Sequence, residues 1–362
     1  MKVKTNTIYF ILCLMLGTLL GYSINQITYQ ETLINVMIIF IITMIIGFPL
    51  ATIIHESGHL ITGLITNYHF VSFQIGKVMI IKQNQHLKIK KCLHKYHAGQ
   101  CLLAPPEYSA KFPYFLYIAG GGFFNLILTI LMILLFLVSS NHLLKIVLLT
   151  FGFINGYLCL INLIPIKALV NDGYHLYLMN LDQDSRYSFY KQLKIGALQA
   201  NGMLLQDMEI QLFKLSQTAN LNNPLHQRIL IARINLFHEQ LKFKEAKALI
   251  DYISQRCQLS KSYQQALQYE YLFYLIMDAK PKTQIKQYYQ EISKDLVKGA
   301  KNNLNCQRIM FAYKLLIEND IEQAQKYLER FNHHAKTYPY ISLLKTEKKI
   351  ILLIKQFKAS KS

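Results

Sequence analysis

The N-terminal half of this 362-residue chain is almost devoid of charge other than lysine. Its first 180 residues contain no arginine and only four acidic residues: Glu31, Glu56, Glu107 and Asp172. The remainder contains 16 acidic and 28 basic residues. Because 52% of the chain is hydrophobic, above the roughly 45–50% of a typical soluble domain, an ordinary soluble fold is excluded for the charge-poor half. The sequence therefore predicts a mainly α-helical protein with a membrane domain, residues 1–180, and a solvated, basic helical domain, residues 181–362.

Three familiar signatures are also missing. The six cysteines are scattered, without the spacing of a secreted disulfide framework, so reduced thiols are expected. The net charge of +19 is not accompanied by a zinc finger, an RNA-binding motif or a dense arginine patch. We therefore expect no nucleic-acid partner, and read the lysine excess as a marker of loops beside anionic lipid headgroups. The first apolar run lacks an A-x-A-like cleavage site, which favours a retained anchor over a signal peptide.

Four apolar segments are long enough to cross about 30 Å of hydrocarbon. They are approximately Thr7–Ile27, Leu33–Ile54, Phe115–Val138 and Ile146–Ile166. The long loop from Asn67 to Pro113 carries seven lysines, and lysines also precede the first segment and follow the fourth. By the positive-inside rule, we expect a multi-pass protein of the cell membrane whose N-terminus, long loop and C-terminal domain are cytoplasmic.

Alternation of apolar and polar residues within the long loop predicts a β-hairpin. The alternation runs from Phe70 to Lys91 and is interrupted by a polar turn at Gln83-Asn84-Gln85. An exposed strand edge in this position could pair with an extended peptide. The hairpin could equally well do no more than cover the loop, and the sequence leaves both interpretations open.

A fixed spacing recurs in the C-terminal half. Stretches beginning at Phe243, Lys282 and Ile321 are similar in pattern and lie 39 residues apart. A period near 40 with two apolar helices per unit is typical of stacked helical hairpins of the tetratricopeptide kind. The alternative is an irregular helical bundle. The sequence leaves open whether this domain binds a peptide, a cytoplasmic partner protein or a regulatory domain.

The second apolar segment ends in the motif H-E-x-x-H, formed by His55, Glu56 and His59. Residues four apart lie on one face of a helix, so the two imidazoles can bind a single ion. Glu56 is then placed to hold a water rather than to bind the ion. Ionisable groups are costly in a membrane and by default mark function. The pattern predicts one catalytic Zn²⁺ with His55 and His59 as ligands and Glu56 as general base.

Zinc held by two imidazoles needs a third protein ligand, and Asp172 is the preferred candidate. It follows the fourth segment, which by the expected topology ends on the same side of the membrane as the second. Asp172 also lies in an Asn-Asp-Gly turn, close to His175, a rival ligand that we consider less well placed. A separate cluster, Cys92, His94, His97 and Cys101, matches no common zinc-binding spacing, and loop residues without metal are the favoured interpretation.

Taken together, these motifs resemble the site-2 protease family of intramembrane zinc metalloproteases. The resemblance is carried by HESGH at the end of one apolar segment, AGGGFFN in the next, and NLIPI with a following DG after the last. It covers about Leu33 to Tyr177. It implies His55, His59 and Asp172 as zinc ligands and Glu56 as catalytic base. It also places Asn125 and Asn162 on the inner faces of their spans, beside the substrate path.

The chain departs from the family pattern at three points. Gly122 stands where proline is usual, two extra residues separate Pro165 from Asp172, and Asn171 replaces the usual leucine or proline before the aspartate. The glycines of AGGG could allow close backbone approach to a substrate or could serve plain helix packing. The expected function is hydrolysis of peptide bonds in a membrane-spanning or membrane-inserted protein or peptide. The alternative is a non-catalytic membrane scaffold that recruits its partner through the helical repeats; a transporter is disfavoured because the spans show no inverted repeat.

Overall fold

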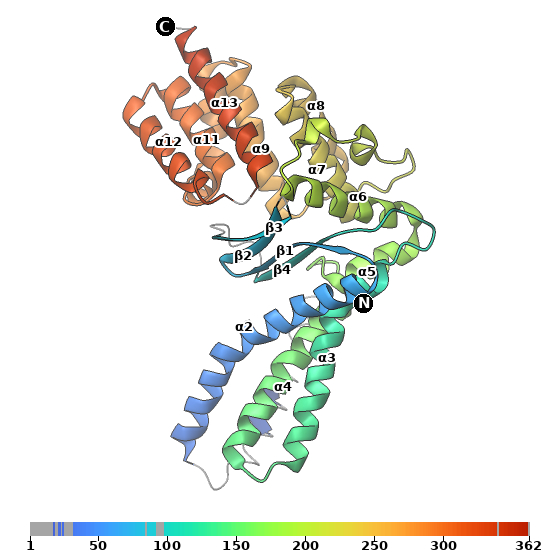
Figure 1. The fold of residues 1–362 in the computed structure, drawn as a ribbon. Helices are drawn as coiled ribbons and strands as arrows, with labels where there is room; N and C mark the ends of the chain where they lie inside the picture. Colours follow the sequence, from blue (N-terminus) through green and yellow to red (C-terminus); the bar gives the residue numbers. More distant parts are fainter. Residues whose placement is uncertain are drawn as a thin grey trace, which may run out of the picture. The chain divides into compact units, whose positions relative to one another are not determined.

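The computed structural model describes residues 17–18, 21–22, 24, 32–83, 85–91, 98–338 and 340–360 (Figure 1). The chain is mainly helical and divides into two compact units. The first comprises Met1–Ile75 and His97–Arg186, and the second Gly76–Tyr96 and Tyr187–Ser362. Most of the first expected span, Thr7–Ile27, and most of the Cys92–Cys101 cluster lie outside the described residues.

Three helices of the first unit are long and apolar enough to cross a membrane: α2 (Leu33–Ile65), α3 (Tyr114–Val138) and α4 (His142–Leu163). They pack against one another and leave rows of isoleucine and leucine exposed, as expected of surfaces that face lipid. The Thr32 hydroxyl caps the start of α2 by accepting from the Asn35 N–H. The helix continues eleven residues beyond the expected end at Ile54, because no breaker follows the motif. His55, Glu56 and His59 therefore lie inside a continuous helix.

Glycines set the distance between α2 and α3. A Cβ added to Gly58 would collide with the backbone of Gly120, and one added to Gly120 would collide with Thr62 Oγ1. The two helices thus cross with their backbones in contact, as small residues permit inside membranes. Close packing of this kind fixes the position of the α2 face that carries the two histidines.

Four short antiparallel strands lie between α2 and α3 in the sequence. In the first unit, β1 (His69–Ile75) pairs with β4 (Gly99–Ala104). In the second unit, β2 (Val78–Gln83) pairs with β3 (His86–Lys91), and Gln83 stands opposite His86. The predicted hairpin around Gln83-Asn84-Gln85 is confirmed. The segment before it is broken by a turn at Gly76, whose φ of 54° favours glycine, and β4 was not predicted.

A short segment links α4 to α5 (Asp172–Leu181), which is followed by α6 (Gln183–Ala200). Asn171 is the N-cap of α5: its Oδ1 accepts from the Tyr174 N–H at 2.9 Å and from the Ile166 N–H at 3.2 Å. Its amide also donates to the carbonyls of Ile161 and Ile164 at the end of α4. The side chain therefore ties the start of α5 to the end of α4.

The rest of the second unit is helical. After the short helices η1 (Leu205–Asp207) and η2 (Ile210–Phe213), consecutive helices from α7 to α12 pack against one another, and α13 packs against α11. Their bounds are α7 Pro224–Glu239, α8 Phe243–Arg256, α9 Lys261–Met277, α10 Lys282–Gly299, α11 Leu304–Tyr313, η3 Lys314–Glu318, α12 Ile321–Ala335 and α13 Ile341–Ala359. Ala246, Ile285 and Ala324, each from one of the three similar stretches, are all buried in the same hydrophobic core. Small or aliphatic residues at these positions let α8, α10 and α12 approach their neighbours closely.

One buried histidine makes this unit sensitive to acid. His238 at the end of α7 lies with Nδ1 2.9 Å from the Tyr274 hydroxyl. Burial lowers the pKa of His238 from 6.5 to about 4; Arg308 acts in the same direction and Glu270 in the opposite one. The folded state therefore favours the neutral ring. The resulting stabilisation is complete above pH 6.5 and is lost as the pH falls from 6.5 towards 4.

We expect the second unit to lose about 2 kcal/mol of stability between pH 7 and pH 5 through His238 alone. Denaturant unfolding of the full chain, followed by circular dichroism at both pH values, measures the loss. In a His238→Gln variant, the difference in the free energy of unfolding between pH 7 and pH 5 should shrink by this amount. Replacement of the exposed His333 should leave this difference unchanged. An equal pH dependence in wild type and His238→Gln would contradict the assignment.

Candidate metal centre

Helix α2 presents two imidazoles side by side on one face. His55 and His59 are one helical turn apart, and their Nε2 atoms are 3.1 Å from each other. The rings meet nearly edge to face, with centroids 4.7 Å apart. His55 is buried and His59 partly so, and the helix therefore places both Nε2 atoms at one point beneath the surface of the first unit.

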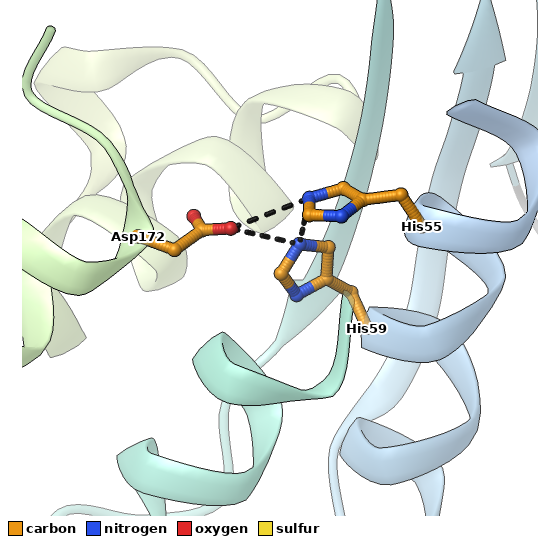
Figure 2. Close-up of side chains that lie close together, drawn as sticks. All are labelled: His55, His59 and Asp172. Carbon is orange, nitrogen blue, oxygen red and sulfur yellow. Dashed lines mark hydrogen bonds and ion pairs between the residues drawn. The ribbon is translucent and has the colours of Figure 1, made fainter. Parts of the chain in front are cut away.

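Asp172, the first residue of α5, completes the group. Its Oδ2 lies 3.3 Å from His55 Nε2 and 3.3 Å from His59 Nε2 (Figure 2). Burial alone would raise the pKa of the Asp172 carboxyl, but the neighbouring His59 and His55 hold it well below its usual range. The carboxylate is therefore ionised and available as an anionic ligand.

The hydrogen-bond network around His55 decides which ring nitrogen carries the proton. Asn155 donates through Nδ2 to the Phe151 carbonyl at 2.9 Å, which leaves its Oδ1 to accept from Asn125 Nδ2 at 2.8 Å. Asn125 Nδ2 also donates to the Ala51 carbonyl, so Asn125 Oδ1 must face His55 Nδ1, at 2.8 Å. Since an amide oxygen only accepts, His55 carries its proton on Nδ1. In the neutral ring, the Nε2 lone pair of His55 points towards Asp172.

His59 is fixed in the same way by a backbone group. Its Nδ1 lies 2.8 Å from the Tyr117 carbonyl oxygen, which can only accept. The Nδ1 of His59 is therefore also protonated, and in the neutral ring its Nε2 carries a lone pair. An outer hydrogen bond that fixes the tautomer and the orientation of a ring is the usual support of a metal-binding histidine.

Three acceptor atoms thus converge with no proton between them in the neutral state of the rings. Two imidazole lone pairs and one carboxylate oxygen lie 3.1 to 3.3 Å from one another. Such an arrangement is repulsive unless a cation lies between them or a ring takes up a proton and donates it to the carboxylate. Ligands of a tetrahedral ion bound at about 2.0–2.1 Å are separated by roughly 3.3 Å. The spacing of the three atoms therefore fits three corners of a tetrahedral metal site, and the group could hold a metal ion.

Comparison of the chain with family models, curated proteins and solved structures finds no match. The site is accordingly interpreted from its own geometry.

Glu56 lies beside the three acceptors without belonging to them. Its side chain is buried, and its carboxylate accepts from the backbone N–H of Cys101 in β4. Gly99, at the start of β4, lies against it: a Cβ there would be 2.6 Å from Glu56 Cγ and 2.8 Å from Oε1. The strand therefore holds the carboxylate next to the candidate ion, where it can bind a water molecule rather than the metal.

Gly121 of α3 packs closely against the two ligand nitrogens. A Cβ at this position would lie 2.5 Å from His59 Nε2 and 2.7 Å from His55 Nε2. The neighbouring Gly122 serves a different purpose, since its absent side chain makes room for Leu163 of α4. Of the three consecutive glycines, Gly121 alone adjoins both ligand nitrogens, and it keeps the space in front of them clear.

Of the other residues singled out in the sequence, Asn125 contacts this group, whereas Asn162 bonds only its own helix. Asn162, expected with Asn125 beside the substrate path, is half-buried on α4 and donates to the Leu158 carbonyl at 2.9 Å. Asn125 is fully buried and contacts His55 directly. Asp172 rather than His175 joins the two histidines in the cluster of potential ligands found among the described residues. Asn155 and the Tyr117 carbonyl were not anticipated, because no local sequence pattern links them to the histidines.

We expect Asn125→Leu to weaken metal binding, because His55 would lose the acceptor that fixes its ring. Loss of such an outer partner typically costs 10–100-fold in metal affinity. Titration of the purified variant with zinc against a chromophoric chelator measures the loss. Asn162→Leu is the matched control, since its amide bonds only the turn of its own helix. Equal affinities for the two variants would show that Asn125 does not support the ligand.

Proposed function

We propose that the chain is an intramembrane zinc endopeptidase of the site-2 protease type, with His55, His59 and Asp172 as zinc ligands and Glu56 as general base. The observation that carries the proposal is the convergence of two imidazole nitrogens and one carboxylate oxygen, with the Nδ1 atom of each ring bonded to an acceptor outside the group. This convergence supports a cation at their centre, and the adjacent Glu56 supports hydrolytic chemistry there. The position of all four residues on or next to apolar helices long enough to span a membrane supports an intramembrane site.

Zinc is the cation best suited to this donor set. Two imidazole nitrogens and one carboxylate oxygen make a borderline ligand set typical of catalytic zinc, which keeps a fourth position for water. Calcium and magnesium prefer six or more oxygen ligands, which this group does not offer. When bound, zinc would polarise the scissile carbonyl and lower the pKa of a bound water towards about 7.

Each of the surrounding residues has its own role in the proposed reaction. Glu56 accepts the proton of the attacking water and delivers it to the leaving amine. The Cys101 N–H holds this carboxylate in place, and Asn125 and the Tyr117 carbonyl keep the two imidazoles in the ligand tautomer. Gly121 leaves room for the peptide carbonyl in front of the ligand nitrogens.

The substrate is proposed to be a membrane-spanning or membrane-inserted segment that unwinds before cleavage. A helix hides its carbonyls in internal hydrogen bonds, so the scissile bond must be presented in extended form. Strand β4 pairs with β1 along one edge and runs beside Glu56, which makes its other edge suitable for pairing with an extended peptide. On the orientation proposed from the lysine distribution, the N-terminus and the second unit face the cytoplasm. We propose separately that the helical pairs of the second unit are tetratricopeptide-like repeats.

Metal analysis of the purified full chain tests the proposal. After removal of metal with a chelator and reloading, we expect about one zinc per wild-type chain, as for a single catalytic site. His55→Ala and Asp172→Ala should each reduce bound zinc at least tenfold, whereas His175→Ala, on the same helix as Asp172, should retain it. A wild-type chain that binds no zinc, or an Asp172→Ala chain that binds it normally, would refute the assignment.

A further inference from the structure

A charged cluster lies buried in the second unit, where α7, α9, α11 and α13 meet. Arg308 of α11 is fully buried, donates through Nη2 to both carboxylate oxygens of Glu270 at 2.6 and 2.8 Å, and donates through Nε to Glu347 of α13 at 2.7 Å. The guanidinium also lies over the Phe273 ring, 4.4 Å from its centroid. A buried ion pair adds little net stability compared with apolar packing, so its presence beneath a terminal helix calls for a different explanation.

Helix α13 buries polar as well as apolar side chains. It packs against α11 (Figure 1). Its buried face begins with Ser342, Thr346 and Glu347, and becomes aliphatic only at Ile350, Ile351 and Ile354. Thr346 Oγ1 donates to Glu239 at the end of α7, 3.3 Å away, so α13 reaches both ends of the row formed by α7, α9 and α11. The helix therefore covers the inner face of that row.

Helix α13 leaves polar atoms without partners where it packs on α7 and α11. Among the described residues, Arg308 Nη1, His238 Nε2 and Ser342 Oγ are buried and have no hydrogen-bond partner. Burying a polar atom without a partner is costly, and a guanidinium N–H is satisfied best by a carboxylate. An occupant that supplied an acceptor to Arg308 Nη1 as well as to Nε would fit this surface better than α13 does.

We propose that the inner face of α7, α9 and α11 is a docking groove for an amphipathic helix of a partner protein that presents a carboxylate to Arg308, and that α13 occupies this groove until the partner displaces it. The groove is defined by His238, Glu239, Glu270 and Arg308. The contacts of α13 indicate which features the groove binds. They are a carboxylate, that of Glu347, and aliphatic residues three, four and seven positions later. This is the spacing of a helix that binds in a groove. The partner carries a carboxylate that pairs with Arg308, ahead of the same aliphatic pattern.

A second copy of the chain is a weaker candidate for this occupant. Exchange of α13 between two copies would replace each contact by the same contact, including the three unmatched polar atoms, so it gains no binding free energy. A partner helix with an additional acceptor does gain free energy, because it satisfies groups that α13 leaves buried and unpaired.

The test uses the full chain in detergent and a fluorescent peptide with the sequence of residues 341–359 as probe. In an Ile354→Asp chain the helix α13 should leave the groove, and we expect the peptide to bind this chain at least tenfold more tightly than wild type. Leu352→Asp, on the exposed face of α13, is the control and should bind the peptide no better than wild type. A peptide with Gln in place of Glu347 should bind the Ile354→Asp chain at least tenfold more weakly. Equal binding by both peptides, or none, would overturn the proposal.

A second measurement uses the unmodified protein, so that it does not depend on a variant that folds. Backbone amides of α13 should exchange with deuterium at least tenfold faster than those of α11, because α13 opens alone and α11 only with the unit. Equal protection of the two helices would show that α13 is part of the core and would overturn the proposal. So would loss of the helical circular dichroism signal in Ile354→Asp, or a wild-type dimer that exchanges α13.

Discussion

Replacement of Glu56 by Gln is expected to abolish peptide hydrolysis and leave metal binding intact. Gln has the shape of Glu and its amide oxygen can still accept from the Cys101 N–H, so the local structure should persist. The amide cannot take a proton from water, and loss of a general base typically costs 10²–10⁴-fold in rate. We expect a fall of at least 100-fold, which corresponds to about 3 kcal/mol of transition-state stabilisation.

Cleavage of single-span candidate substrates, co-expressed with the wild type or the variant, provides the measurement. Bound zinc should be equal in wild type and Glu56→Gln, because Glu56 does not belong to the group of converging acceptors. Glu107→Gln, which alters an exposed acidic residue of the same unit, is the control and should retain activity. Equal processing by wild type and Glu56→Gln would favour the alternative function, a membrane scaffold that recruits a partner through its second unit.

The ligand group illustrates what a single sequence can predict. His55 and His59 follow from helical spacing alone, since residues four apart share a face. Asp172 could be predicted because the N-terminal half contains few carboxylates. Only one of them is expected at the same depth in the membrane as the two histidines. The structure brings these three residues together. Their proximity could be predicted because helical periodicity and the cost of charge in a membrane are local properties of the chain.

The support of the ligands could not be predicted in the same way. Asn155 reaches His55 only through Asn125, across two helices whose relative rotation depends on side-chain packing. The Tyr117 carbonyl carries no sequence signal, because every residue has one. Likewise β4 is a short strand that depends on its pairing with β1. Contacts between distant segments produce no periodic pattern in the sequence, so the contact of Asn125 with His55 was not predicted.

The departure of Asn171 from the family pattern acquires a physical explanation. A leucine or proline before the aspartate could not make the four hydrogen bonds by which Asn171 joins the end of α4 to the start of α5. These bonds fix the first turn of α5, which carries Asp172. The connection between Pro165 and Asp172 is two residues longer than the pattern has, and the Asn171 side chain fixes its conformation. The sequence showed the departure, but only the structure showed what compensates for it.

Substitution of Gly121 by Ala is expected to remove the metal without unfolding the protein. The added methyl group would lie 2.5 Å from His59 Nε2 and 2.7 Å from His55 Nε2, well inside van der Waals contact. At least one imidazole must turn away, which also breaks its bond to Asn125 or to the Tyr117 carbonyl. We expect zinc affinity to fall at least 100-fold, about 3 kcal/mol, in a chelator competition assay.

Two other glycines make the result specific. Gly156→Ala on α4 places its methyl group 3.4 Å from Thr129 Cγ2, an ordinary contact, and should leave both zinc affinity and melting temperature unchanged. Gly120→Ala forces α3 away from Thr62 and the Gly58 backbone, so it should lower the melting temperature as well as metal binding. Normal zinc affinity in Gly121→Ala would mean that the ion does not lie in front of the two Nε2 atoms. If Gly121→Ala loses zinc at an unchanged melting temperature, Gly121 belongs to the metal site. Gly120, by contrast, would serve the packing of α3 against α2.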